Sequence, residues 1–503
     1  MKHYFILLGM AFCMTQGHAQ NHQTKTQQSV FDQFLHSATA EFDDFSQQSE
    51  REFETFRRKM MQEFIGFVRQ PWKEFQETPP VPMPKDDEVP PVVMPRDDEG
   101  KAHEDRPVRI DTVIAPQPVE PQPTPVVPIE EVPVAEEKTL DFVFFGTPAT
   151  VRFDTAHRIR LNGIDENSIA DALGRINPTD YDNMMIDCLA LRDRLQLSDW
   201  GYIQMLKALC DKIEGNGTNE SALLLAYVYM QSGYKMRLAT RGSKLYMLYA
   251  SKYQIFNQSS FGVGGDVYYG VEDLPTSLHI CQAAFPKEKS LSLMINGRQL
   301  FAENASEPRT IRSERYPDIT ITCSVNKNLI DFYNTYPTSM TGDDFMTRWA
   351  LYANTPLGAK VQSQIYPTMR ERLKGLTQLD AANRLLNLVQ TGLAYEYDNK
   401  VWGRDRAFFS EESLFYPFCD CEDRSILFTR LVRDLLGLDC ILIYYPGHLA
   451  AAVAFTEEVR GDYLLVGGKK FVVADPTFIN AAVGSTMPGM DNQSASVIIL
   501  SAR

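Results

Sequence analysis

Aromatic residues recur at helical spacing near the start of the chain. Between Phe31 and Phe75 they fall mainly three, four, seven or eight positions apart, and charged residues and Gln fill most of the gaps. This pattern predicts an amphipathic helix or a helical hairpin with one apolar face, which we assign to residues 20–75. Two uses of that face stay open: packing within the protein, or docking onto a partner protein or a membrane surface.

Residues 76–138 lose this periodicity. They are dense in Pro and acidic residues, and "PMPKDDE" is echoed by "VMPRDDE". Such a composition buries too little apolar surface to offset the entropy of ordering the chain. The pattern predicts an extended, disordered linker.

Structured patterns return at residue 139. Strand-like alternation is followed by two helical stretches, by a helix that ends at Gly233 and by further strands, so residues 139–273 read as one α+β domain. Residues 274–342 contain short β-rich segments such as "DITITCSV". Residues 343–503 begin with helices that reach Tyr397 and form the third region. The chain is therefore predicted to be α+β.

The third region contains one helix with a well-marked start and end. From Ile426 to Leu436 apolar residues recur at i, i+4 spacing, and Gly437 is a suitable C′ residue. Glu422 and Asp423 then lie in the first turn, where acids suit the helix dipole. This places Cys421 at or just inside the helix N-terminus, where unpaired N–H groups favour a thiolate.

Two later strands carry a histidine and an aspartate. His448 opens a strand after the turn at Pro446-Gly447, and Asp475 closes another strand. If these strands are antiparallel neighbours, the imidazole and the carboxylate meet at one end of the sheet, facing Cys421. This requires one reversal between them. We expect it at the glycine pair in "VGGKK", with Thr456–Asp462 a bulge or loop that extends the His448 strand.

A cysteine, a histidine and an aspartate brought together in this way form a nucleophile, a base and an orienting acid. Such a set attacks an acyl carbon and gives a thioester, which water or an amine then resolves. The expected outcomes are peptide or amide hydrolysis, deamidation or amide cross-linking.

The motifs "DCEDRSILFTRLVRDLLGL", "YPGH" and "VADPTF" resemble those of transglutaminase-like cysteine enzymes. The resemblance covers residues 366–478 and implies a papain-like fold, with a helix packed on an antiparallel sheet. It assigns Cys421 as nucleophile, His448 as base and Asp475 as orienting acid. The family's oxyanion donor has no clear counterpart here, and Tyr397 and Trp402 are the candidates.

An earlier segment echoes this region. Aligned without gaps, the 34 residues from Gly217 run against those from Cys421, so that Gly233 meets Gly437 and Lys244 meets His448. A degenerate copy of the transglutaminase-like domain within residues 139–273 is one interpretation. Lacking the cysteine and the histidine, such a copy would act as scaffold or binding surface.

Charge and the first residues bear on location. The formal net charge of -15 argues against a nucleic-acid partner. Residues 1–19 have a basic start, a short apolar run and Ala19 at a suitable cleavage position, which is typical of a signal peptide. We therefore expect an exported protein, periplasmic or extracellular, soluble or peripherally attached.

The cysteines leave alternatives open. Removal of residues 1–19 would leave seven cysteines, an odd number that gives at least one free thiol. A zinc site made by Cys419, Cys421, His448 and Asp475 is one rival, and a disulfide of Cys419 is another. The one-residue Cys spacing is unlike the usual zinc clip.

The favoured function is a cysteine peptidase or amidase that acts on protein or peptide substrates without a cofactor. The alternative is a non-catalytic module that binds a peptide or protein on the same fold.

Overall fold

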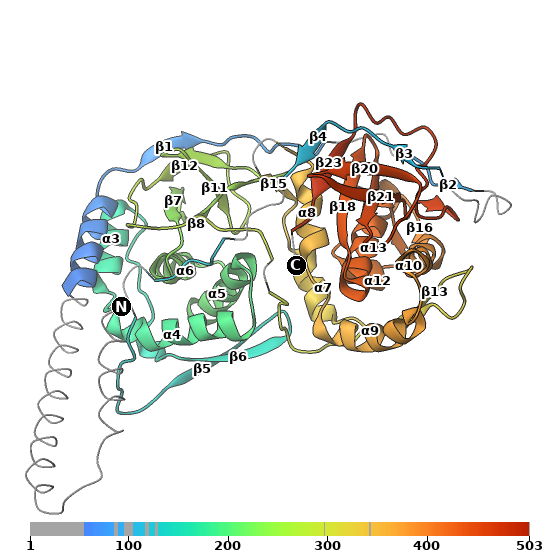
Figure 1. The fold of residues 1–503 in the computed structure, drawn as a ribbon. Helices are drawn as coiled ribbons and strands as arrows, with labels where there is room; N and C mark the ends of the chain where they lie inside the picture. The colour runs from blue at the N-terminus through green and yellow to red at the C-terminus, as the bar shows by residue number, and fades with distance from the viewer. Residues whose placement is uncertain are drawn as a thin grey trace, which may run out of the picture. The chain divides into compact units, whose positions relative to one another are not determined.

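The computed structural model describes residues 55–84, 89–94, 104–115, 120–125, 129–295, 297–341 and 344–501 (Figure 1). The chain divides into two compact units, Met1–Gln62 and Glu63–Arg503. Residues 55–68 are helical. The predicted signal peptide and most of the predicted amphipathic segment lie outside the described residues. None of the described helices is both long enough and apolar enough to span a membrane.

The second unit is a mixture of helices and mainly antiparallel sheets, so the predicted α+β class is confirmed. Its helical elements are η3 (Thr155–His157), α3 (Glu166–Arg175), α4 (Thr179–Arg194), α5 (Asp199–Glu214), α6 (Asn219–Gln231), α7 (Lys327–Asn334), α8 (Thr347–Asn354), α9 (Ala359–Leu373), α10 (Gln378–Gly392), α11 (Asp398–Val401), α12 (Ser410–Phe415) and α13 (Cys421–Leu436). Its first strands are β1 (Lys73–Gln76), β2 (Val92–Val93), β3 (Arg106–Pro107), β4 (Thr112–Ile114), β5 (Thr139–Phe144), β6 (Thr147–Arg152), β7 (Met236–Arg241), β8 (Lys244–Ser251), β9 (Tyr253–Ile255), β10 (Phe261–Val263), β11 (Asp266–Gly270) and β12 (Ser277–Ile280). The later strands are β13 (Arg309–Arg312), β14 (Thr320–Cys323), β15 (Ser339–Thr341), β16 (Ala394–Tyr395), β17 (Phe418–Cys419), β18 (Asp439–Tyr445), β19 (His448–Ala454), β20 (Asp462–Val466), β21 (Lys469–Ala474), β22 (Phe478–Ile479) and β23 (Ser496–Ile499).

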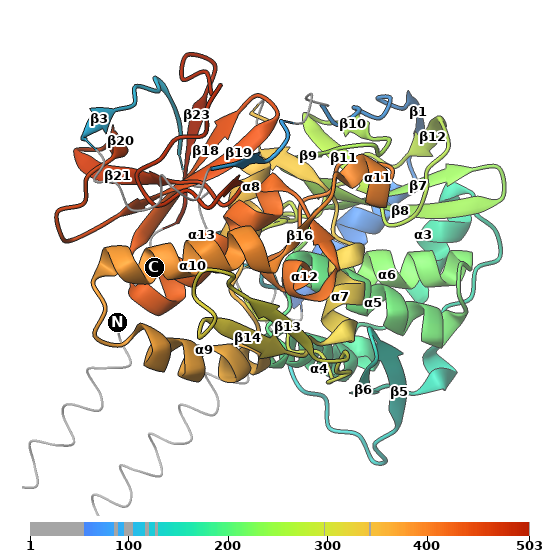
Figure 2. The same ribbon diagram turned by 90° about the vertical axis from the view of Figure 1, so that its right-hand side faces the viewer.

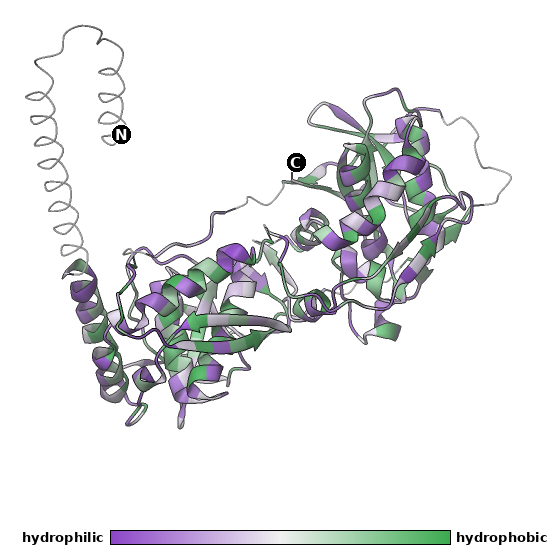
Figure 3. Ribbon diagram, turned by 90° about the horizontal axis from the view of Figure 1, so that it is seen from below, coloured by the Kyte–Doolittle hydropathy of each residue, from purple (hydrophilic) through white to green (hydrophobic). Residues whose placement is uncertain are grey.

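A six-stranded sheet organises the region upstream of residue 281. Its order is β1-β12-β7-β8-β11-β10, and every neighbouring pair is antiparallel. Helix α6 packs on β7 and β8 and also against α5. Helices and strands in Figure 3 carry both apolar and polar residues, and the central strands β7 and β8 are buried over most of their length.

A seven-stranded sheet organises the C-terminal region, in the order β3-β20-β21-β19-β18-β23-β4. The inner pairs are antiparallel, whereas the outermost strands β3 and β4 run parallel to their neighbours. Helix α13 packs on β18 and β19, and α10 packs on α13 (Figure 2). All seven residues of β19 are buried, as expected for a central strand covered on both sides.

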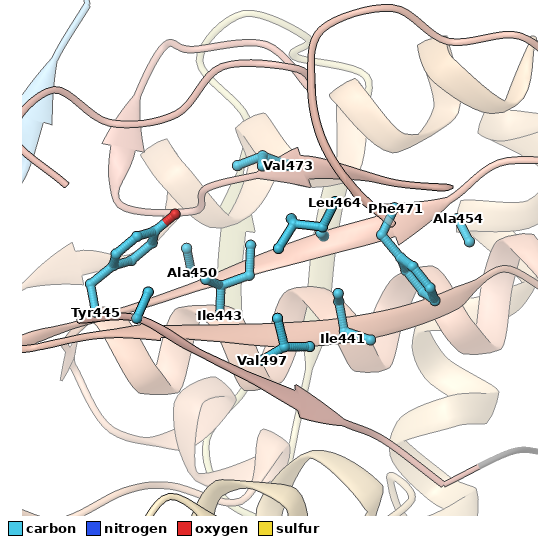
Figure 4. Close-up of a cluster of buried hydrophobic side chains, with 11 residues drawn as sticks. Ile441, Ile443, Tyr445, Ala450, Ala454, Leu464, Phe471, Val473 and Val497 are labelled. Carbon is cyan, nitrogen blue, oxygen red and sulfur yellow. The ribbon is translucent and has the colours of Figure 1, made fainter. Parts of the chain in front are cut away.

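A hydrophobic cluster that includes Ile441, Ile443 and Val497 lies on the other face of this sheet (Figure 4). Val108 and Ile110, from the Pro-rich segment, pack against this cluster. Burial of these apolar side chains is the favourable term that fixes an otherwise extended stretch of chain.

The disordered linker predicted for residues 76–138 is therefore wrong for the described parts of that segment. Strand β2 pairs with β22, β3 with β20 and β4 with β23. Composition alone missed this, because the sheet edges and apolar grooves that order the segment are supplied by residues hundreds of positions away.

The chain reverses once between β19 and β21. Gly467 and Gly468, both at positive φ, form the expected tight turn between β20 and β21. Strand β21 lies antiparallel between β19 and β20, so β19 and β20 run in the same direction. The prediction that Thr456–Asp462 extends the His448 strand is wrong, since this connection passes across β21 and Asp462 opens a separate strand.

The β-rich pattern predicted for residues 274–342 corresponds to several short elements. Strand β12 belongs to the six-stranded sheet, β13 pairs with β14, and β15 pairs with β9. Helix α7 lies within the same range.

The two sheets share one order of connections. In the upstream region, α6 ends at Gly233 and is followed by the hairpin β7-β8. In the C-terminal region, α13 ends at Gly437 and is followed by the hairpin β18-β19. Both glycines have positive φ. A second hairpin follows in each region. In the upstream hairpin β10-β11, strand β11 lies beside β8. In the C-terminal hairpin β20-β21, strand β21 lies beside β19. Strands β12 and β23 complete each set beside β7 and β18. This is the arrangement expected of two copies of one unit, and the duplication stays an interpretation.

Candidate functional site

Helix α13 begins at Cys421, as its sequence pattern predicts. The carboxylate of Asp423 accepts hydrogen bonds from the backbone N–H groups of Asp420 (3.3 Å) and Phe408 (2.7 Å). An acidic side chain in the first turn thus holds the preceding residue in place, as in a capping box. At the other end, Gly437 takes the left-handed conformation that ends the helix.

His448 and Asp475 meet at one end of the seven-stranded sheet. Nε2 of His448 lies 2.8 Å from Oδ2 of Asp475, and both residues are buried. The other carboxylate oxygen, Oδ1, accepts the N–H groups of Thr477 (2.8 Å) and Phe478 (3.2 Å). The strands β19 and β21 are antiparallel neighbours, as predicted, because Ala451 pairs with Ala474.

The loop that carries Asp475 is held by a buried glutamine. Nε2 of Gln390, on α10, lies within hydrogen-bond distance of the carbonyls of Asp475 (3.0 Å), Phe478 (2.7 Å) and Ala481 (3.1 Å). The buried Arg424, on α13, donates to the carbonyls of Gln390 and Pro476. The orientation of Asp475 is therefore set by two helices.

Cys421 and His448 line the same pocket. The hydroxyl of Ser425 donates to the carbonyl of Leu449 (2.7 Å), which ties the first turn of α13 to β19. The N–H of Leu449 donates to the sulfur of Cys421. Nδ1 of His448 is buried and has no hydrogen-bond partner among the described residues. With Nε2 engaged by Asp475, Nδ1 is the nitrogen that can take a proton.

The surroundings of the Cys421 sulfur favour the thiol. Burial, and then the charges of Glu422 and Asp420, raise the pKa of Cys421 well above its ordinary value. Sγ donates to Oε2 of Glu422 at 3.3 Å. The sequence predicts the opposite, a thiolate favoured by the helix N-terminus. Desolvation and two adjacent carboxylates oppose that effect here.

Four carboxylates line the pocket beside the sulfur: Asp398, Asp405, Asp420 and Glu422. The only Lys or Arg among its lining residues is Arg348, whose guanidinium lies 3.2 Å from Asp405. Burial and then the charge of Asp405 raise the pKa of Glu422 to about 7. Sequence analysis missed Asp398 and Asp405, because nothing in the local pattern shows that the segment 398–405 returns to the N-terminus of α13.

The wall of the pocket is aromatic. It includes Trp349, Tyr395 and Tyr444, and the rings of Trp349 and Tyr444 are stacked with centroids 5.1 Å apart. Tyr397 and Trp402, the donors suggested by the sequence, are not among the lining residues. Tyr395 and Trp349 line it instead, and Nε1 of Trp349 is buried without a hydrogen-bond partner in the described part of the chain.

The rival readings of the cysteines fit the geometry less well. All seven described cysteines are free, and Cys419 points its sulfur at the carbonyl of Ala394 (3.7 Å). Within the described ranges, metal-binding side chains gather as Asp420, Cys421 and Glu422 and as Asp398, Asp405 and Glu422. Neither group contains Cys419, His448 or Asp475, so the predicted zinc ligands do not converge.

The equivalent positions in the upstream sheet are occupied differently. In the gap-free alignment, β8 begins at Lys244 where β19 begins at His448. The β8–β11 register, continued by two residues, places Glu272 opposite Tyr246. The β19–β21 register, continued by one residue, places Asp475 opposite Ala450, which is aligned with Tyr246. Nζ of Lys244 lies 2.6 Å from Oε2 of Glu272. An ion pair, with no cysteine facing it at Gly217, stands where the C-terminal region has its histidine and aspartate.

Comparison of the chain with protein-family models, with curated proteins and with solved structures finds no match.

Proposed function

We propose that the chain is an exported transglutaminase-like cysteine enzyme that acts on amide bonds of proteins or peptides, as a peptidase or amidase. The observation that carries the proposal is the 2.8 Å contact between His448 and Asp475, with His448 and Cys421 lining one pocket. A histidine oriented by an acid and facing a cysteine is the set that nucleophilic acyl transfer requires.

The catalytic step follows from the free nitrogen of His448. Nδ1 takes the proton of Cys421, and the sulfur attacks the carbonyl carbon of the amide to form a tetrahedral intermediate. The protonated imidazole, stabilised by Asp475, then gives its proton to the leaving amine as the C–N bond breaks. Water attacks the resulting thioester, regenerates the thiol and releases the acid.

The raised pKa of Cys421 bears on this step. Because a free thiolate is disfavoured, the proton moves to His448 as the sulfur attacks rather than beforehand. The negative charge that develops on the carbonyl oxygen needs donors. The N–H groups of the first turn of α13, the hydroxyl of Tyr395 and the indole N–H of Trp349 are the groups that we assign to this role.

An activated ester tests the proposal directly. With p-nitrophenyl acetate the wild-type protein should release a burst of p-nitrophenolate and carry one acetyl group, which peptide mapping places on Cys421. Cys421→Ser should lose the burst, and the matched variant Cys419→Ser should keep it. A label spread over several cysteines, or a burst that survives in Cys421→Ser, would contradict the proposal.

Export is part of the same proposal. It predicts that the mature protein begins at Gln20 and is recovered outside the cytoplasm. N-terminal sequencing of the protein from fractionated cells checks both points, and a cytoplasmic protein that begins at Met1 would refute them.

The second candidate is a peptide- or protein-binding module. The observation that favours it is the acidic, buried surroundings of Cys421, which hold the sulfur as a thiol. In that case Cys421→Ser would bind ligands as the wild type does, and no acyl-enzyme would form.

A further inference from the structure

The pocket beside Cys421 is lined by four carboxylates and by one guanidinium, that of Arg348. Of the four carboxylates, Asp405 is paired with Arg348. Asp420 and Glu422 are buried beside the sulfur. Buried carboxylates so close together repel one another.

One carboxylate oxygen has no partner at all. Asp420 is only 4% exposed and lines the pocket, and its Oδ1 makes no hydrogen bond to any described residue. A buried acceptor left unsatisfied is rare and calls for an explanation, and a donor supplied by a bound ligand is one that fits an oxygen lining a pocket. This observation is independent of the number of acids around it.

The arrangement of the acids would place a bound cation beside the sulfur of Cys421. Ligand atoms of Asp398, Asp405 and Glu422 lie within 4.8 Å of one another, and so do those of Asp420, Cys421 and Glu422. Glu422 belongs to both groups, so a cation bound there would lie close to Sγ.

We propose that this pocket binds a positively charged side chain of the substrate, of the arginine or lysine type, in the segment that supplies the acyl group. The claim rests on the proposed function, since it names the substrate class of that site. The bound charge is a recognition element and does not react. It also offsets the carboxylates that oppose ionisation of Cys421, so a basic substrate assists the attack that it undergoes.

Two charged thiol reagents of matched length test the proposal without catalysis. The cationic 2-(trimethylammonium)ethyl and the anionic 2-sulfonatoethyl methanethiosulfonates each give a mixed disulfide on Cys421 and release methanesulfinate. Rates are followed by peptide mapping and divided by those for free cysteine. We expect the cation to react at least about tenfold faster, because opposite charges attract strongly at short range in a pocket of low dielectric.

Variants locate the source of that preference. Asp420→Asn and Glu422→Gln should each lower the ratio severalfold, whereas Glu458→Gln, an exposed acid outside the pocket, should leave it unchanged. Equal rates for the two reagents would overturn the proposal, and so would an unchanged ratio in both pocket variants. Failure of both reagents to label Cys421 would also overturn it, since the pocket would then not admit such a group.

Protection of the wild-type protein gives a second measurement that needs no folded variant. Nα-acetyl-arginine methylamide should slow alkylation of Cys421 by neutral iodoacetamide, and the uncharged citrulline analogue should not. If both compounds protect equally, the pocket does not recognise charge. If calcium or magnesium chloride removes the reagent preference while potassium chloride of equal ionic strength does not, the acids form a metal site and the proposal fails.

These outcomes are separable from the proposed function. Charge preference in labelling requires only an accessible thiol, so it can hold in a protein that forms no acyl-enzyme. Conversely, an acetyl-enzyme on Cys421 with no charge preference would support the enzyme and exclude basic substrates.

Discussion

The upstream and C-terminal sheets are built on the same connections but differ in what they hold at one end. The C-terminal sheet brings a buried imidazole and a buried carboxylate together beside a cysteine. The upstream sheet has a partly exposed lysine–glutamate pair at the aligned positions. The helix, the glycine that ends it and the two hairpins occur with either set of side chains. The comparison therefore teaches that the scaffold and the side chains at this end of the sheet can vary independently.

The largest expected effect concerns the basic residues at the two aligned positions, His448 and Lys244. His448→Ala should slow acetylation of Cys421 by about 10²–10⁴-fold, since it removes the proposed general base. Lys244→Ala, at the aligned position, should leave the rate unchanged. Burst kinetics with p-nitrophenyl acetate measure both. Similar losses in the two variants would mean that the upstream pair takes part in the chemistry.

The next effect concerns the loop that positions Asp475. Gln390→Met should lower the free energy of unfolding by about 3 kcal/mol, because it leaves buried carbonyls without a donor. Urea denaturation measures the loss, and Gln493→Met, at an exposed glutamine, is the control. A loss no larger than that of the control would show that the loop holds its shape without Gln390.

A pH effect on stability is expected from α12, which precedes α13. Burial raises the pKa of Glu411 to about 7, above its ordinary value of 4.5. The folded state then holds a proton that the unfolded state has lost, so stability is greatest below about pH 4.5 and falls as pH rises towards 7.

Replacing Glu411 by Gln should remove about 2 kcal/mol of that fall between pH 5 and pH 7. Thermal or urea unfolding at the two pH values measures the difference. The exposed Glu458→Gln should leave the pH dependence as in the wild type. If Glu411→Gln behaves in the same way, the carboxyl group is ionised in the folded protein at pH 7.

The smallest effect compares the two helix ends. Gly233→Ala should cost at least about 1 kcal/mol more than Gly437→Ala, although both glycines have positive φ. A Cβ at Gly233 would lie 2.2 Å from the carbonyl oxygen of Thr124, in the Pro-rich segment. Equal costs would indicate that this segment is easily displaced from α6.

Sequence patterns predicted the helix ends and the tight turn of the site, which depend on residues close together in the chain. The start of α13 at Cys421, its end at Gly437 and the tight turn at Gly467-Gly468 follow from periodicity and turn residues. Each of these features is fixed by neighbours within a few positions.

What the sequence did not reveal depends on contacts between distant segments. Asp398 and Asp405 enter the pocket from α11 and from the segment after it. Gln390 reaches the Asp475 loop from α10, and strands of the Pro-rich segment pair with the edges of the C-terminal sheet. The direction of the Cys421 pKa was missed for the same reason, since burial is a property of the assembled site.

The short strands β3 and β4 lie at opposite edges of the C-terminal sheet, and both come from residues 104–115. They cover backbone groups that would otherwise be available to a strand of another molecule. A protease that cut within this stretch would expose two edges at once. Self-association after limited proteolysis, rather than simple unfolding, is the behaviour that this arrangement would then produce.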